Sequence, residues 1–320
     1  MKILSLSVLA GVLATPAMAC DLCSVFSAAQ ANGEIGKGFY ASMAEQFTHF
    51  GTLQMDGVKV PNDAPQHEDS SVTQVAVGYN FNDRFGLQFN LPVIHRSYQR
   101  PDGLGGLERG TESGVGDVSL LANVRVLNLE EKNFTFRWTA LGGVKLPSGD
   151  SRRLYEEVLE QTAPPPPPGA PDSAIHGHDL ALGTGSVDAI LGTAFYLRSQ
   201  RFFFTTSVQY AIRTKGDFDY HYANDLTFSG GPGVYLALAD KYTLAVQFVV
   251  SGEDKGRDTF QGAVADDTGI TSVYIGPEVH FTWSEHLSLV AGFDLPVSIN
   301  NTALQSVPDY RVRLGVTWHF

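Results

Sequence analysis

Two short groups of residues carry side chains that can bind a metal or form a covalent bond. Cys20 and Cys23 form a Cys-x-x-Cys pair and are the only cysteines in the chain. Such a pair forms a disulfide in an oxidising compartment, and it also suits a redox centre or a soft metal. His176, His178 and Asp179 offer a second, weaker set of metal ligands within one loop. We favour a disulfide at the cysteines and expect no resident cofactor at either group.

Other chemistries lack residues that they need. Ser24 stands where a haem-attachment motif requires a histidine, and no second cysteine pair completes a four-cysteine zinc site. A hydrolase would need a serine beside a histidine that an acid or amide orients, and the positions of Ser207 and His280 give no such arrangement. We therefore expect a protein that is not an enzyme.

Residues 1–19 predict a secretory signal peptide. Lys2 provides the positive charge, residues 3–12 an apolar run, and Ala17 and Ala19 the small residues before a cleavage site. The apolar run is too short to span a membrane as a helix. Acylation of Cys20 is an alternative, which we disfavour because Ala17 stands where lipoprotein signals usually carry leucine. The chain is therefore expected to leave the cytoplasm.

The C-terminal residues alternate without a break between apolar and polar side chains. The apolar face holds Tyr310, Val312, Leu314, Val316, Trp318 and Phe320, and the polar face holds Arg311, Arg313, Gly315, Thr317 and His319. A period of two is the pleat of a β-strand with one apolar face. A strand that ends in an aromatic residue, here Phe320, also resembles the signal that the outer-membrane barrel assembly machinery recognises. These features favour a β-barrel over a soluble β-sandwich, which shares the alternation.

The same alternation recurs along the chain and predicts about twelve strands, an even number that is typical of bacterial barrels. We place the strands near 38–50, 71–82, 84–98, 114–127, 133–146, 185–198, 201–214, 225–239, 241–252, 270–283, 286–299 and 308–320. The predicted fold is all-β: a transmembrane, antiparallel, up-and-down β-barrel over 38–320. Residues 20–37 form a short N-terminal segment that we expect to narrow or plug the periplasmic mouth.

The connections between these strands alternate in length. Short ones lie near 82–84, 128–132, 199–200, 240–241 and 284–285, and long ones near 51–70, 99–113, 147–184, 215–224, 253–269 and 300–307. Barrels have short periplasmic turns and long outer loops, so both termini should be periplasmic, in the cell outer membrane. Aromatic side chains beside the short turns predict a girdle at the lipid headgroups: Phe81, Phe85, Phe134, Phe202, Tyr242, Phe281, Trp283 and Trp318. The longest loop contains Pro164 to Pro168, which predicts a stiff, extended segment. We favour a solvated spacer, and the alternative is an arm that grips a ligand or binds a partner.

Charged side chains on the polar faces predict the inner wall of the barrel. They are Asp117, Arg125, Arg137, Lys145, Asp188, Arg213, Glu278, His280, Asp294, Arg311 and Arg313. On the lipid face, each charge at the membrane midplane would cost about 2–4 kcal/mol. Because both signs occur, we expect ion pairs across the lumen, which either line a pathway or close it. A barrel of about twelve strands lies between filled and open barrels in size, so any pore should be narrow.

The formal net charge of -12 argues against nucleic acid as a partner, because phosphates would repel the chain. It does not oppose insertion into lipid, since a barrel meets the membrane through apolar side chains. The expected partners are outer-membrane lipid, the barrel assembly machinery and a small-molecule solute.

Several short motifs follow one another in a recognisable order. They are Asn90-Leu-Pro-Val93, Gly114-Val-Gly-Asp117, Lys145-Leu-Pro-Ser-Gly-Asp150, Gly183-Thr-Gly-Ser-Val-Asp188, Gly231-Pro-Gly-Val234, Gly276-Pro-Glu-Val279 and Asp294-Leu-Pro-Val297. Taken together, they resemble the outer-membrane transporter-like family described as MetA-pathway of phenol degradation proteins. The resemblance implies an outer-membrane protein that moves small organic compounds. Cys20, Cys23 and the proline-rich loop are not part of that pattern.

The sequence thus predicts a channel or transporter for small, including organic, solutes, with a narrow lumen of mixed charge. The alternative is a membrane-anchored module that binds a metal or carries out redox chemistry through Cys20 and Cys23.

Overall fold

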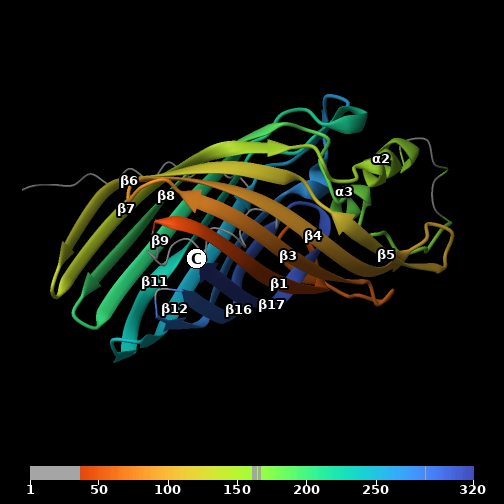
Figure 1. Cartoon of the computed structure of the whole chain (residues 1–320). Coiled ribbons are helices and arrows are strands. Elements are labelled where there is room, and N and C mark those ends of the chain that lie inside the picture. Colours follow the sequence, from red (N-terminus) through yellow and green to blue (C-terminus); the bar gives the residue numbers. More distant parts are fainter. Residues whose placement is uncertain (1–36, 161–163, 165–166, 285) are drawn as a thin grey trace, which may run out of the picture.

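The computed structural model describes residues 37–160, 164, 167–284 and 286–320 (Figure 1). The predicted signal peptide, the Cys20 and Cys23 pair and nearly all of the N-terminal segment 20–37 lie outside the described residues. Parts of the proline-rich stretch do so as well. The predictions for these segments therefore stay predictions.

Long antiparallel strands form a closed barrel of 12 strands. They are β1 (Gly38–Met55), β3 (His67–Asn80), β4 (Phe85–Pro101), β6 (Val118–Glu131), β7 (Phe134–Leu146), β8 (Asp188–Ser199), β9 (Phe202–Ile212), β11 (Asp225–Leu238), β12 (Tyr242–Lys255), β15 (Ile270–Trp283), β16 (Leu287–Asn301) and β17 (Leu304–His319). Each pairs with the next barrel strand, and β17 pairs with β1, which closes the sheet. The predicted fold class and strand number are confirmed.

Shorter elements lie in the connections. β2 (Val58–Val60) and β5 (Leu107–Val115) extend the barrel sheet beside β1 and β4, whereas β10 (Tyr220–His221), β13 (Thr259–Phe260) and β14 (Ala263–Val264) form a separate small sheet. The helices are η1 (Arg152–Leu154), α2 (Tyr155–Glu160), α3 (Gly177–Leu180), η2 (Asp217–Asp219) and η3 (Asp266–Thr268). In the described part of the chain, none of the helices has both the length and the apolar character to cross a membrane. Figure 1 shows α2, α3 and β5 together at one end of the barrel.

Side chains along the strands alternate between the two faces of the wall. In β9, Phe202, Phe204 and Val208 are exposed on the outside, whereas Thr205 and Gln209 are buried inside. This alternation follows from the pleat, and lipid contact favours the apolar side chains on the outer face. The aromatic residues beside the short turns are exposed, as a girdle requires: Phe81, Phe85, Phe134, Phe202, Tyr242, Trp283 and Trp318, with Phe281 partly exposed.

Polar side chains interrupt the outer face on β1 and β3. Glu45 follows the exposed Met43 by two residues, so it points outward, where Ser71 and Thr73 donate hydrogen bonds to its carboxylate. His49 Nδ1 lies 2.6 Å from Asp69 Oδ1 on the neighbouring strand. The alternation pattern missed these outward groups, because the partners that satisfy them come from a different strand.

One predicted connection is wrong. Residues 300–307 were expected to form a long outer loop, but β16 and β17 are joined only by Thr302 and Ala303. Ala303 has a positive φ of 51°, and the Asn301 side chain donates a hydrogen bond to the Ala303 carbonyl oxygen at 2.9 Å. Asparagine can hydrogen-bond to nearby backbone and so stabilise a tight turn. The run of polar residues around this turn resembled a longer loop in the sequence.

Candidate functional site

The candidate site is the interior of the barrel, whose wall is polar around its circumference. All but two of the residues predicted for this wall are buried: Asp117, Arg125, Lys145, Asp188, Arg213, Glu278, Asp294, Arg311 and Arg313. Arg137 and His280 are partly buried. The structure therefore places these side chains on the inner face, and their role in solute passage stays a prediction.

One group of buried charges lies on β7, β8 and β11 and directly beside the ends of β6 and β9. Lys145 Nζ lies 2.5 Å from Asp117 Oδ2 and 2.9 Å from Asp188 Oδ2. Arg213 Nη1 lies 3.0 Å from Asp188 Oδ2, and the same guanidinium pairs with Asp225. Lys145 and Asp188 are direct partners in the β7–β8 ladder, which fixes their approach.

A second group lies on β12, β15, β16 and β17. The Arg313 guanidinium donates to both oxygens of Asp294, at 2.7 and 2.9 Å, and its Nη1 lies 2.8 Å from Glu278 Oε2. Glu278 also approaches His280 Nε2 at 3.0 Å, and Arg311 donates to Glu253 at 2.8 Å. Most of these charges pair with a charge on a neighbouring strand, because neighbouring strands are only about 5 Å apart. Arg313 on β17 instead reaches Glu278 across β16, and Arg311 on β17 reaches Glu253 on β12 across β16 and β15. Pairing across the full width of the lumen stays a prediction.

The longest connection, between β7 and β8, folds into the mouth of the barrel at the end that carries the long connections. Leu154 packs in an apolar cluster with Tyr220 and Phe260, and Leu180 packs with Ile175 beneath Tyr98. These two parts of the loop, on either side of the proline-rich stretch, are therefore packed rather than solvated, whereas Pro164, Pro167 and Pro168 are exposed. The prediction of a solvated spacer for the proline-rich stretch stays a prediction.

Hydrogen bonds from the barrel strands and from the connection between β10 and β11 fix this inserted loop. Arg96 Nη1 donates to the carbonyl oxygens of Asp179 and Ala181, at 2.6 and 2.8 Å. Tyr222 donates to the His178 carbonyl oxygen at 2.9 Å, and the Ser306 amide donates to the Ala174 carbonyl oxygen at 3.1 Å. These bonds satisfy loop carbonyls that would otherwise be buried without partners.

The loop histidines take part in ion pairs with carboxylates. His178 Nδ1 lies 2.8 Å from Glu157 Oε1, and its Nε2 lies 3.4 Å from Asp179 Oδ1. His176 Nδ1 lies 3.2 Å from Glu160 Oε2, and the two imidazole rings stack with centroids 5.7 Å apart. Within the described residues, no group of three or more His, Cys, Asp or Glu side chains is placed to hold a metal ion. Metal binding here stays a prediction, and the geometry gives these side chains other partners.

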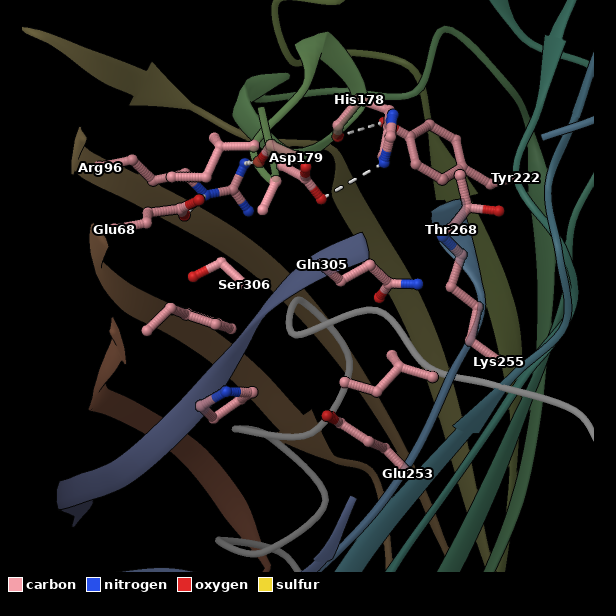
Figure 2. A pocket seen from close by; sticks show the side chains of 15 residues that line it. Glu68, Arg96, His178, Asp179, Tyr222, Glu253, Lys255, Thr268, Gln305 and Ser306 are labelled. Atoms are coloured by element: carbon pink, nitrogen blue, oxygen red, sulfur yellow. Dashed lines mark hydrogen bonds and ion pairs between the residues drawn. The ribbon is translucent and has the colours of Figure 1, made fainter. Parts of the chain in front are cut away.

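A cavity of about 130 Å³ lies directly beneath the inserted loop (Figure 2). His178 and Asp179 face it from the loop, whereas Glu68 and Arg96 face it from β3 and β4. Glu253 and Lys255 line the opposite side from β12. The cavity thus lies where the inserted loop meets the inner wall.

The sequence prediction missed several interior charges at the outer end, namely Asp225, Glu253, Lys255 and Asp258, all of them buried. The alternation in β12 continues through Val249, Glu253 and Lys255, but the predicted strand ended at residue 252.

The structure shows no hydrogen bond between Ser207 and His280. Ser207 donates a hydrogen bond to the Ser229 carbonyl oxygen, and His280 lies beside Gln247 and Glu278.

No protein-family model matches this chain, and no curated protein matches its sequence. Among solved structures, the chain is similar to an outer-membrane channel from Pseudomonas putida F1, with a TM-score of 0.62 and 16% identity over 89% of this chain and 97% of that one. At this identity, the likeness shows the fold alone. The fold is that of an outer-membrane β-barrel.

Weaker likenesses carry no argument. The translocator domain of the autotransporter NalP from Neisseria meningitidis gives a TM-score of 0.43 and 14% identity, over 92% of this chain and 93% of that one. A FadL homologue from Pseudomonas aeruginosa gives a TM-score of 0.38 and 12% identity, over 93% of this chain and 95% of that one. The motif resemblance to the MetA-pathway of phenol degradation family stays a prediction.

Proposed function

We propose that this chain is an outer-membrane channel for small solutes. One observation carries the proposal: buried polar and charged side chains line the inner face of a closed barrel whose outer face is largely apolar. A lumen of this kind accommodates water and polar groups, whereas the outer face accommodates lipid. The protein from Pseudomonas putida F1 with a similar fold is described as an outer-membrane channel, which supports the same class of function.

The dimensions of the barrel favour solutes of low molecular mass. Barrels with eight strands are filled by side chains, and those with 16 to 18 strands leave an aqueous channel. This barrel has 12 strands, and the loop between β7 and β8 narrows its outer mouth further. We therefore propose a narrow passage of mixed charge rather than a general pore.

The proposed location is the outer membrane, with both termini at the periplasmic side. The start of β1 and the end of β17 lie side by side, because the Phe320 amide donates a hydrogen bond to the Phe39 carbonyl oxygen. The short turns lie at this same end of the barrel. Long connections lie at the opposite end. Barrels carry their long loops on the outer surface. Lipid and the assembly machinery are the proposed macromolecular partners.

Single-channel conductance in planar bilayers tests the proposal. The purified protein should conduct ions, and a variant in which a short Gly-Ser linker replaces residues 152–180 should conduct more, because the inserted loop is gone. A matched control changes the tip Gly103-Leu104-Gly105 between β4 and β5, where Leu104 is exposed and a Cβ added at either glycine would meet no atom within 4 Å, and it should leave the conductance unchanged. Heat-dependent migration on gels confirms that each variant is a folded barrel. The absence of current in both the natural protein and the linker variant would overturn the proposal.

A further inference from the structure

We infer that the cavity beneath the inserted loop binds one small, neutral organic molecule that carries a hydroxyl or N–H donor. The inference rests on the proposed channel function, and it names the class of solute that the outer mouth selects. Three independent properties of the cavity support it: unpartnered acceptors, balanced charge and a partly apolar lining around a space of defined size.

The cavity contains buried acceptors that have no partner in the described chain. Glu253 is only 5% exposed, and its Oε1 accepts hydrogen bonds from Ser272 at 2.7 Å and Arg311 at 2.8 Å. Its other oxygen, Oε2, is buried without a hydrogen bond to any described residue, and so is Ser306 Oγ. Leaving a buried polar atom unsatisfied costs about 1–3 kcal/mol, so native proteins rarely do so. A bound donor would satisfy them, and Glu253 and Ser306 both line the cavity.

The charges that face the cavity are already balanced. Arg96 Nε lies 3.4 Å from Glu68, and Lys255 Nζ lies 2.6 Å from Asp258. His178 is held between Glu157 and Asp179 on the loop. A charged ligand would have to compete with these pairs in a partly desolvated space, which is costly. The arrangement therefore favours a neutral molecule.

Apart from the polar residues Thr268 and Gln305, the remaining lining is largely apolar and limits the size of the ligand. Phe50, Ile175, Ile270 and Pro308 contribute hydrocarbon surface, and Tyr222 contributes one aromatic ring. The volume of about 130 Å³ is close to that of an engineered protein cavity of about 150 Å³ that accepts benzene. One six-membered ring, or a chain of similar volume, therefore fits. Figure 2 shows Glu253 across the cavity from His178 and Asp179, so that a donor on the ring can reach the carboxylate.

A pair of matched probes tests this inference. Cyclohexanol and methoxycyclohexane have the same ring, but only cyclohexanol donates a hydrogen bond. In an NMR titration observing the probe, with the full-length protein in detergent, cyclohexanol should bind about tenfold more tightly or better, as expected for a hydrogen bond to a charged acceptor. Glu253→Gln should bring the ratio of the two affinities close to one, and Ser306→Ala should reduce it by about threefold.

The matched control is Asp254→Asn. Asp254 is the next residue on β12 and is hydrogen-bonded to Thr271 at 3.0 Å, and it does not line the cavity. It should leave the affinity ratio unchanged. Equal affinities for the two probes in the natural protein, or a full preference retained in Glu253→Gln, would overturn the inference. If Glu253→Gln does not fold, the ratio in Ser306→Ala decides.

The conductance experiment separates this inference from the channel itself. Current without a preference for cyclohexanol would remove the binding site and leave the channel. A preference without current would remove the channel, and the cavity would still be a binding site for this class of molecule.

Discussion

Asp294 of β16 lies opposite Arg311 of β17, and this is the last pair in the ladder that joins the two strands. Both strands continue to the turn at Thr302 and Ala303, but there β16 pairs with β15 and β17 pairs with β1. Pro296 and Pro308 lie in the two stretches without a common ladder, and proline has no N–H to donate. We call this interruption, between residues 295–301 and 304–310, the seam.

Backbone amides beside the seam should exchange with deuterium faster than those of an unbroken ladder. The reason is that amides directed into the seam have no partner in the facing strand. Ser306 is the exception, because its amide bonds to Ala174. Hydrogen exchange followed by mass spectrometry, on protein in lipid nanodiscs, measures the effect. The internal control is the β12–β15 ladder, which is continuous from Tyr242 and Trp283 to Lys255 and Ile270. Equal protection in both regions would show that the wall is sealed there.

His178 makes the packing of the inserted loop depend on pH. Burial by itself lowers the pKa of His178, but the carboxylates of Asp179 and Glu157 outweigh it and raise this pKa to about 10. A histidine with a raised pKa stabilises the packed loop fully below its ordinary pKa of about 6.5, and this stabilisation is lost as the pH rises toward 10. Burial raises the pKa of Glu157, but its bond to His178 outweighs this and lowers the pKa to about 2. The contribution of Glu157 is therefore lost only as the pH falls from about 4.5 toward 2.

We expect the loop over 151–187 to become more sensitive to protease between pH 7 and pH 10. Limited proteolysis with proteinase K, followed by mass spectrometry, measures cleavage within the loop. His178→Gln should be cleaved faster at pH 7 and should lose most of the alkaline dependence, because the titrating group is gone. His67→Gln replaces an exposed histidine at the start of β3 and serves as the control. An identical pH profile for His178→Gln and the natural protein would contradict the assignment.

Lys145 should be essential for the stability of the barrel. Its ammonium lies between two buried carboxylates, those of Asp117 and Asp188. Removing one partner of a buried ion pair typically costs about 3–5 kcal/mol, because the remaining charge stays buried and uncompensated. Lys145→Met should therefore lower the free energy of unfolding by roughly this amount, as measured by urea unfolding in lipid vesicles. The exposed pair Lys215 and Asp219 is the control, and Lys215→Ala should cost no more than about 1 kcal/mol.

The strand ends near the short turns could be predicted from the sequence, whereas the outer ends could not. At the short turns, the alternation stops at Asn, Asp and Ser residues beside aromatic side chains, so two signals mark the same strand ends. At the opposite end, the outward positions are no longer regularly apolar, as His49 and Asp69 illustrate, so the alternation does not mark where a strand stops. β1 therefore continues to Met55 and β12 to Lys255 beyond the point where the apolar pattern fades.

The inner-wall charges could be predicted because a strand fixes the direction of each side chain. Their pairing could not, since it depends on which strands are neighbours and on their register, as the ladder position of Lys145 and Asp188 illustrates. The position of the inserted loop was even less predictable from the sequence. Its placement depends on Arg96 reaching the carbonyl oxygens of Asp179 and Ala181, which are distant in the sequence. No local pattern carries that information.

Glu45 offers a test of how a barrel tolerates an outward carboxylate. It lies opposite Thr73 in the β1–β3 ladder and opposite the exposed Leu314 in the β1–β17 ladder, and Ser71 and Thr73 donate hydrogen bonds to it.

If these hydroxyls compensate the carboxylate, the double variant Ser71→Ala, Thr73→Ala should lower the free energy of unfolding by about 2 kcal/mol, because a charged group loses its donors. In a chain that already carries Glu45→Leu, the same two changes should cost less than about 0.5 kcal/mol, since no carboxylate remains to be stabilised. Urea unfolding in lipid vesicles measures all four proteins of this cycle. An equal cost in both backgrounds would mean that the hydroxyls stabilise the wall independently of Glu45, and the outward carboxylate would then be solvated by the membrane interface instead.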